Sequence, residues 1–201
     1  MVCVFSYFCS RENKSKPVKM MSKNIKLFRK EPTMNAVLYI VSKMGGKVDM
    51  HKIFKTLYFA DMMHLAKYGR AITGDVYIAM EYGPVPSKTD DIFKAVRGDS
   101  YFQAGELAKY FHFINKYVIE NSRECDTDWL SESDIECLDT AIEKCKGKSF
   151  NEMTDISHGL AWKNTPRNQE ISVRDILRES GETEEYADYI AHELEIESAL
   201  L

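Results

Sequence analysis

The sequence predicts a mainly α-helical, compact single domain that carries small β-elements. Three observations lead to this fold class. Apolar residues recur at three- and four-residue spacing over most of the chain, serine-initiated capping motifs precede several of these stretches, and only two short segments show strand patterns. The 201 residues, of which 44% are hydrophobic and 11% aromatic, are enough to bury one sizeable core.

Two helices are predicted near the start of the core. The first begins its helical spacing of apolar residues at Met34, and the pattern stops at Gly45. The second is expected to use Asp49 as its N-cap and to end where Gly69 can adopt the left-handed conformation. Because the second helix is apolar on more than one face, we expect it to lie centrally in the fold.

Two segments favour β-structure. The alternation of residues over 76–82 is typical of a half-buried strand, and we expect Gly83 and Pro84 to end it because proline lacks an amide donor. Near residues 110–120, Asn115 and Lys116 separate two β-rich runs. This arrangement predicts a small hairpin.

Further helices are predicted from Ser-x-x-Asp/Glu capping boxes, in which each side chain accepts a hydrogen bond from the other residue's free amide. The four pairs are Ser87 with Asp90, Ser131 with Asp134, Ser149 with Glu152, and Ser172 with Asp175. A last amphipathic helix is expected to carry Tyr186, Ile190 and Leu194 on one stripe.

The chain is expected to have three parts. Residues 1–32 form a basic, poorly ordered extension, 33–168 the core domain, and 169–201 C-terminal helices with an acidic tail. Translation from Met20 or Met21 is an alternative start. The net charge of −4 argues against a protein whose main work is binding nucleic acid, although the basic arm leaves such a contact open.

The cysteines and the apolar start indicate a cytoplasmic protein. Five cysteines form no Cys-x-x-Cys pair, and their odd number does not suggest a disulfide framework. The apolar run at residues 2–9 is too short to cross a bilayer, and no cleavage site follows it. We therefore expect neither secretion nor a membrane partner.

Few residues suggest chemistry. Asp61 lies in an apolar setting, where it is either a catalytic carboxylate or, as we favour, a hydrogen-bonded structural one. Cys137 or Cys145 would need a remote histidine to act as a nucleophile. Trp162 is either a partner-binding anchor or, as we favour, a core residue packing the final helices with its indole hydrogen bond satisfied. No catalytic, cofactor or metal site is predicted.

Two sequence blocks resemble the SocA-like Panacea antitoxin family. They are KTLYFADMMHLAKYGRAITGDVYIAMEYGPVPSKTDDIFKAVRG and LSESDIECLDTAIEKCKGKSFNEMTDISHGLAWKNT, which lie within residues 35–165 in the family's order. The resemblance assigns residues 33–168 to the antitoxin domain. The positions that match the family motif, with a role in the fold or in toxin binding, are Lys55, Leu57, Tyr58, His64, Leu65, Gly69, Tyr82, Gly83, Pro84, Val85, His158 and Trp162.

The resemblance implies a mostly helical bacterial protein that binds and neutralises a cognate protein toxin, without catalysis or a cofactor. It also implies two alternatives: an adaptor that delivers a toxin to a ClpXP-type protease, and a phage-associated, GepA-like regulator or nucleic-acid-binding protein. Some members carry an added DNA-binding domain. The segment of about thirty residues before the core is too short for a helix-turn-helix domain, which argues against promoter binding.

Overall fold

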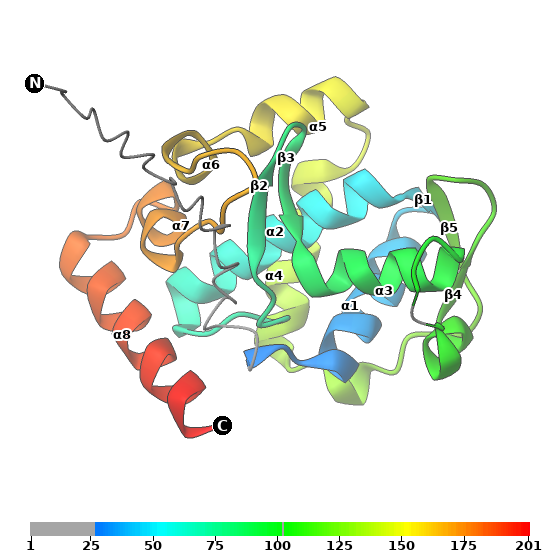
Figure 1. The fold of residues 1–201 in the computed structure, drawn as a ribbon, viewed down its shortest axis with the longest axis horizontal. Helices are drawn as coiled ribbons and strands as arrows, with labels where there is room; N and C mark the ends of the chain where they lie inside the picture. The colour runs from blue at the N-terminus through cyan, green and yellow to red at the C-terminus, as the bar shows by residue number, and fades with distance from the viewer. Residues whose placement is uncertain (1–26, 102) are drawn as a thin grey trace, which may run out of the picture.

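A computed structural model describes residues 27–101 and 103–201 of the chain. The predictions made for residues 1–26, including the basic arm and the alternative starts, lie outside these residues. The described part forms eight α-helices and five short strands around one apolar core (Figure 1). The predicted mainly α-helical fold with small β-elements is confirmed.

Helix α2, Met50–Tyr68, is the central element of this core. Asp49 caps its start by accepting a hydrogen bond from the amide of His51 at 2.8 Å, and Gly69 ends it with a φ of 70°. Both predicted ends are confirmed. Buried residues lie on several faces of α2, which contacts α1 (Lys30–Lys43), α4 (Glu132–Cys145) and the β2–β3 hairpin.

The segment predicted as one strand is a hairpin. β2, Tyr77–Met80, pairs antiparallel with β3, Gly83–Pro86. The predicted strand thus ends at Met80, and Gly83 and Pro84, which we expected only to end it, lie in a second strand that was not predicted. The prolines fit because the residues opposite them, Ala79 and Tyr77, turn their backbone groups away from β3. These groups bond to residues 168–171 instead, at 2.8–2.9 Å. Neither proline is therefore required to donate an amide hydrogen bond across the hairpin.

A second sheet packs beside α1 and α3 (Ser87–Arg97). The hairpin predicted at 110–120 is confirmed as β4, Phe111–Phe113, and β5, Val118–Asn121. A third strand, β1, Lys47–Asp49, pairs with β5 and gives the order β1-β5-β4. This strand was not predicted, because three residues are too few to show a strand period.

The capping boxes at Ser131 and Ser149 are confirmed at the starts of α4 and α5 (Phe150–Ser157). Ser172 caps α7 (Val173–Glu179) by accepting from the amide of Asp175. The box predicted at Ser87 is wrong, because Ser87 lies inside α3 (Ser87–Arg97).

Helix α3 is capped from a distant loop. The carboxylate of Asp75 accepts hydrogen bonds from the amides of Lys88 and Thr89 at 2.9 and 2.8 Å. It thereby satisfies two free amides of the first helical turn, which differ from the amides of Ser87 and Asp90 that the predicted box would have bonded.

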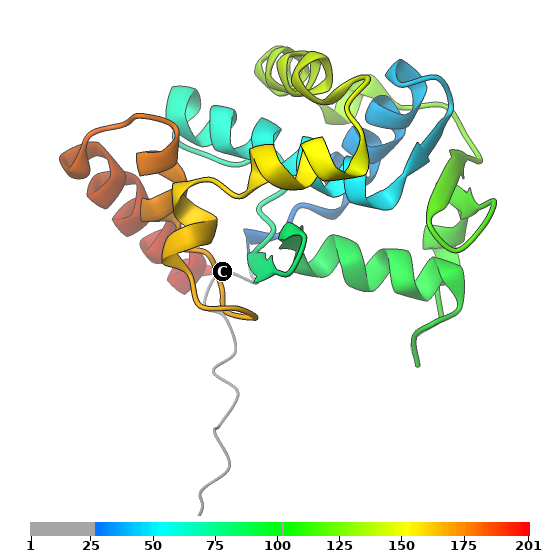
Figure 2. The same ribbon diagram turned by 90° about the horizontal axis from the view of Figure 1, so that it is seen from above.

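The remaining elements are the C-terminal helices and two short helices in loops. α6, Leu160–Asn164, is followed by α7 and then by α8, Glu184–Leu200, which lies at the edge of the molecule beside α7 (Figures 1 and 2). Its predicted stripe faces inward, with Ile190 buried and Tyr186 and Leu194 partly buried. Two short 3-10 helices, Gly105–Lys109 and Thr127–Trp129, lie in the connecting loops.

Candidate functional site

Lys55, on α2, holds the β2–β3 hairpin from inside the protein. Its side chain is fully buried, and Nζ donates a 2.7 Å hydrogen bond to the carbonyl oxygen of Pro84. Desolvation lowers the pKa of Lys55 to about 7, and no carboxylate in the described part of the chain forms an ion pair with it. A neutral amine can still donate this bond, so the contact does not depend on the charge.

Gly83 makes this close approach possible. Its φ is 98°, a conformation that side chains disfavour. A Cβ atom at this position would lie 2.3 Å from Oγ of Ser157 and 3.0 Å from Cε of Lys55. The hairpin therefore packs onto α2 and α5 only if residue 83 has no side chain.

His158 and Trp162 also support the hairpin. Their rings stack with centroids 3.6 Å apart, and Trp162 Nε1 donates to the carbonyl oxygen of Met80 at 2.8 Å. The indole hydrogen bond is satisfied, as expected for a packed tryptophan. However, the ring packs on the hairpin and stays partly exposed, which differs from the predicted position between the final helices.

The rings of Tyr82, Phe150 and His51 pack together at the hairpin tip. With Met80, which is exposed at the end of β2, they form what we call the hairpin surface. Tyr82 is 52% exposed, and its ring lies 5.3 Å from that of Phe150, which stacks on His51 at 4.1 Å. His51 Nε2 lies 3.1 Å from the carbonyl oxygen of Tyr82. Burial, with a smaller effect of the Lys55 charge, lowers the pKa of His51 to about 4. The imidazole of His51 is therefore neutral near pH 7.

The buried position of Lys55 predicts a pH dependence of stability. The folded chain loses the Lys55 proton near pH 7, whereas the unfolded chain keeps it to about pH 10.4, so unfolding in this window takes up a proton. Relative to Lys55→Met, the free energy of unfolding of the wild type should rise by about 3 kcal/mol from pH 7 to pH 10. Urea unfolding of both proteins at each pH measures this difference. A pH-independent difference would show that Lys55 keeps its ordinary pKa.

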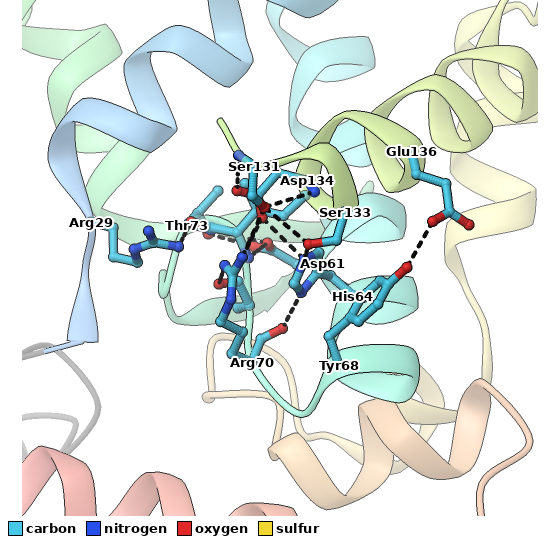
Figure 3. Close-up of polar contacts among 12 residues, drawn as sticks. Arg29, Asp61, His64, Tyr68, Arg70, Thr73, Ser131, Ser133, Asp134 and Glu136 are labelled. Carbon is cyan, nitrogen blue, oxygen red and sulfur yellow. Dashed lines mark hydrogen bonds and ion pairs between the residues drawn. The ribbon is translucent and has the colours of Figure 1, made fainter. Parts of the chain in front are cut away.

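A second polar cluster lies near the C-terminal half of α2, around Asp61 (Figure 3). Asp61 is 1% exposed, and its Oδ1 accepts from the amides of Ile72 and Thr73 at 2.7 and 3.0 Å. Its Oδ2 accepts from the hydroxyls of Thr73 and, at 2.8 Å, Tyr77. Burial raises the pKa of Asp61, and these four donors oppose the rise. The carboxylate fixes the loop after α2, which supports the structural interpretation of this residue.

His64 joins α2 to the start of α4 in the same cluster (Figure 3). It is fully buried and donates from Nδ1 to the carbonyl oxygen of Arg70 at 2.8 Å, while Nε2 lies 3.0 Å from both Ser133 Oγ and Asp134 Oδ1. Burial would raise the pKa of Asp134, but hydrogen bonds from His64 and Ser131 and the charge of Arg70 hold it below 3.8. Serine and acid share one imidazole nitrogen, so this is not the relay geometry of a Ser-His-Asp triad.

The candidate cysteines are buried as thiols. Burial raises the pKa of Cys137 to about 11 and raises that of Cys145 as well, which works against a nucleophilic thiolate. In residues 27–101 and 103–201, no group of three His, Cys, Asp or Glu side chains is arranged to hold a metal ion. No helix in these ranges combines the length and apolar character needed to cross a membrane.

Comparison with known proteins identifies the scaffold. Residues 53–163, more than half of the chain, match the family described as antitoxin SocA-like, Panacea domain. The chain belongs to this antitoxin family. No curated protein and no solved structure matches it. The Panacea segment runs from α2 to the end region of α6 and contains every motif residue predicted from the sequence, whereas α1, α7 and α8 lie outside it.

The Panacea motif residues do not form one site. At the hairpin the structure brings together Lys55, the Tyr82–Val85 segment, His158 and Trp162. His64 instead binds the start of α4, and Gly69 ends α2. The core of α2 contains Leu57, Tyr58 and Leu65, all buried.

Three members of the hairpin surface, His51, Met80 and Phe150, were not predicted as site residues from the sequence. The sequence could have indicated His51, because it lies four residues before Lys55 and therefore on the same face of the helix. No feature of the sequence indicated Phe150, because its contacts with Tyr82 and His51 join segments that are far apart in the chain.

Proposed function

We propose that this Panacea protein is a cytoplasmic antitoxin that neutralises a cognate protein toxin by direct protein–protein binding. The match of residues 53–163 to the antitoxin family carries the proposal. The free state of the three described cysteines, Cys125, Cys137 and Cys145, supports a reducing compartment. Direct neutralisation requires an exposed surface on which a protein can dock.

The hairpin surface is the toxin-binding site in this proposal. Tyrosine and methionine are enriched in protein interfaces, tyrosine especially at their energetically important centres, and Met80 and Tyr82 are both exposed at the hairpin tip. The rings beneath them are already stacked, so binding costs little side-chain entropy. The exposed side chains of Met80 and Tyr82 carry no charge, and the pKa of His51 is lowered, so the surface favours an apolar patch on the toxin.

Co-expression with the product of the neighbouring open reading frame tests the function. We expect the two proteins to co-purify and this chain to restore growth when that product is toxic alone. Rescue in a strain that lacks ClpXP would support neutralisation by binding over delivery to the protease. If the chain rescues growth from no adjacent toxic product, the proposal is wrong.

Replacing Tyr82 with Ala should weaken toxin binding by about 10- to 100-fold, because truncating an interface centre costs about 1–3 kcal/mol. The stability of the free protein should change little, since this ring is exposed. Tyr117→Ala is a matched control: Tyr117 is 53% exposed but lies at the β4–β5 hairpin. Calorimetric titration measures both affinities, and equal losses in the two variants would exclude the hairpin surface as the binding site.

A further inference from the structure

Helix α8 has two apolar faces that point in opposite directions. The inner face packs on the protein through Ala187, Ile190, Ala191, Leu194 and Ser198. The outer face carries Tyr189, Ile196 and Leu200, which are 59%, 43% and 82% exposed. Their spacing of seven and four residues places them on one stripe along the helix. A helix packed on a domain needs only the inner face, so the outer stripe has no role in the fold.

The carboxylates around the outer stripe lack basic partners within the described part of the chain. On the side facing α7, Asp188 and Glu195 form ion pairs with Arg174, and Glu184 pairs with Arg178. Glu185, Glu193 and Glu197 flank the outer stripe, and no described lysine or arginine forms an ion pair with them. The helix itself contains neither lysine nor arginine. A partner protein could supply cations for these three carboxylates.

This charge pattern indicates which kind of partner could bind the outer face of α8. Two copies of α8 packed on each other would bring glutamates against glutamates, which is unfavourable, and an anionic lipid surface would repel them. A protein surface with an apolar centre and flanking lysines or arginines complements both features. We propose that the outer face of α8 is a second protein-binding surface for such a partner, separate from the hairpin surface. An amphipathic helix fits the stripe, because α8 presents about 25 Å of straight surface.

Two synthetic helical peptides test this chemistry on the full chain. Both carry a leucine stripe, with flanking lysines in one and flanking glutamates in the other. In NMR titrations we expect the lysine peptide to shift the amide signals of residues 185–200 saturably, with an affinity that falls about fivefold or more between 50 and 500 mM NaCl. The glutamate peptide should cause no such shifts. Similar binding of both peptides would overturn the proposal.

Substitutions of exposed residues distinguish specific binding to the outer face of α8 from non-specific electrostatic attraction. Tyr189→Ala combined with Ile196→Ala should weaken the lysine peptide about tenfold or more. Glu193→Gln with Glu197→Gln should weaken it about threefold, whereas the charge-matched pair Glu124→Gln with Glu143→Gln, on distant exposed positions, should not. Equal effects of the two glutamate pairs would contradict the proposal. So would a concentration-dependent dimer of the free chain that Ile196→Ala abolishes. Because no toxin is used, the outcome is independent of the proposed function.

Discussion

Replacing Asp61 with Ala should lower the free energy of unfolding by about 3–5 kcal/mol. The change removes the acceptor for two amides and two hydroxyls, all of them buried. Each buried donor left without a partner costs about 1–3 kcal/mol, although these costs are not additive. Urea unfolding followed by circular dichroism measures the effect.

Two further variants define what Asp61 does. Tyr77→Phe removes one of the four donors without leaving a donor unsatisfied, so a loss of about 1 kcal/mol is expected. Asp91→Ala changes an exposed aspartate and should stay within about 0.5 kcal/mol of the wild type. If Asp61→Ala were as mild as Asp91→Ala, the carboxylate would not be holding the loop after α2.

Replacing Gly83 with Ala should lower the free energy of unfolding by about 3 kcal/mol. One part of the cost arises from the backbone, because a φ of 98° is strained for any residue with a Cβ atom. The larger part is steric, since the new methyl group would lie 2.3 Å from Oγ of Ser157. To relieve the clash, the hairpin must move away from Lys55 and Trp162, so toxin binding is expected to weaken as well.

The chain offers a matched control for this substitution. Gly98 has a φ of 86°, and a Cβ atom added there would meet nothing within 4 Å, so Gly98→Ala should cost only the backbone part, about 1 kcal/mol. Adding Ser157→Ala to Gly83→Ala removes the clashing oxygen and should recover part of the lost stability. Equal losses for Gly83→Ala and Gly98→Ala would show that the hairpin does not pack closely against Ser157.

Asp61 and Gly83 both connect the scaffold to the proposed activity. Asp61 fixes the loop that carries Thr73, and the same loop presents Asp75 to the start of α3. The hairpin follows this loop directly, and its turn carries the exposed Tyr82. Substitutions at these two buried positions should therefore reduce binding through stability, whereas Tyr82→Ala should reduce binding alone.

Local sequence signals were sufficient for the elements whose ends depend on neighbours a few residues away. Asp49 and Gly69 bound α2 through local backbone geometry, and the boxes at Ser131 and Ser149 close within three residues. The two motif blocks likewise indicated the Panacea family, to which the chain belongs. None of these features requires knowledge of how distant segments pack.

The remaining features depend on tertiary packing, because their partners are far apart in the chain. Pro84 can lie in a strand because the amide of Ala79, the residue opposite it, donates its hydrogen bond to Gln169 and not to β3. The first free amides of α3 are bonded by the carboxylate of Asp75 and not by a serine at the start of the helix. Lys55 finds its acceptor 29 residues away. Hydrogen bonds of this range leave no periodic signal in the sequence. The hairpin surface, assembled from α2, the β2–β3 turn and α5, is visible only once those segments have packed together.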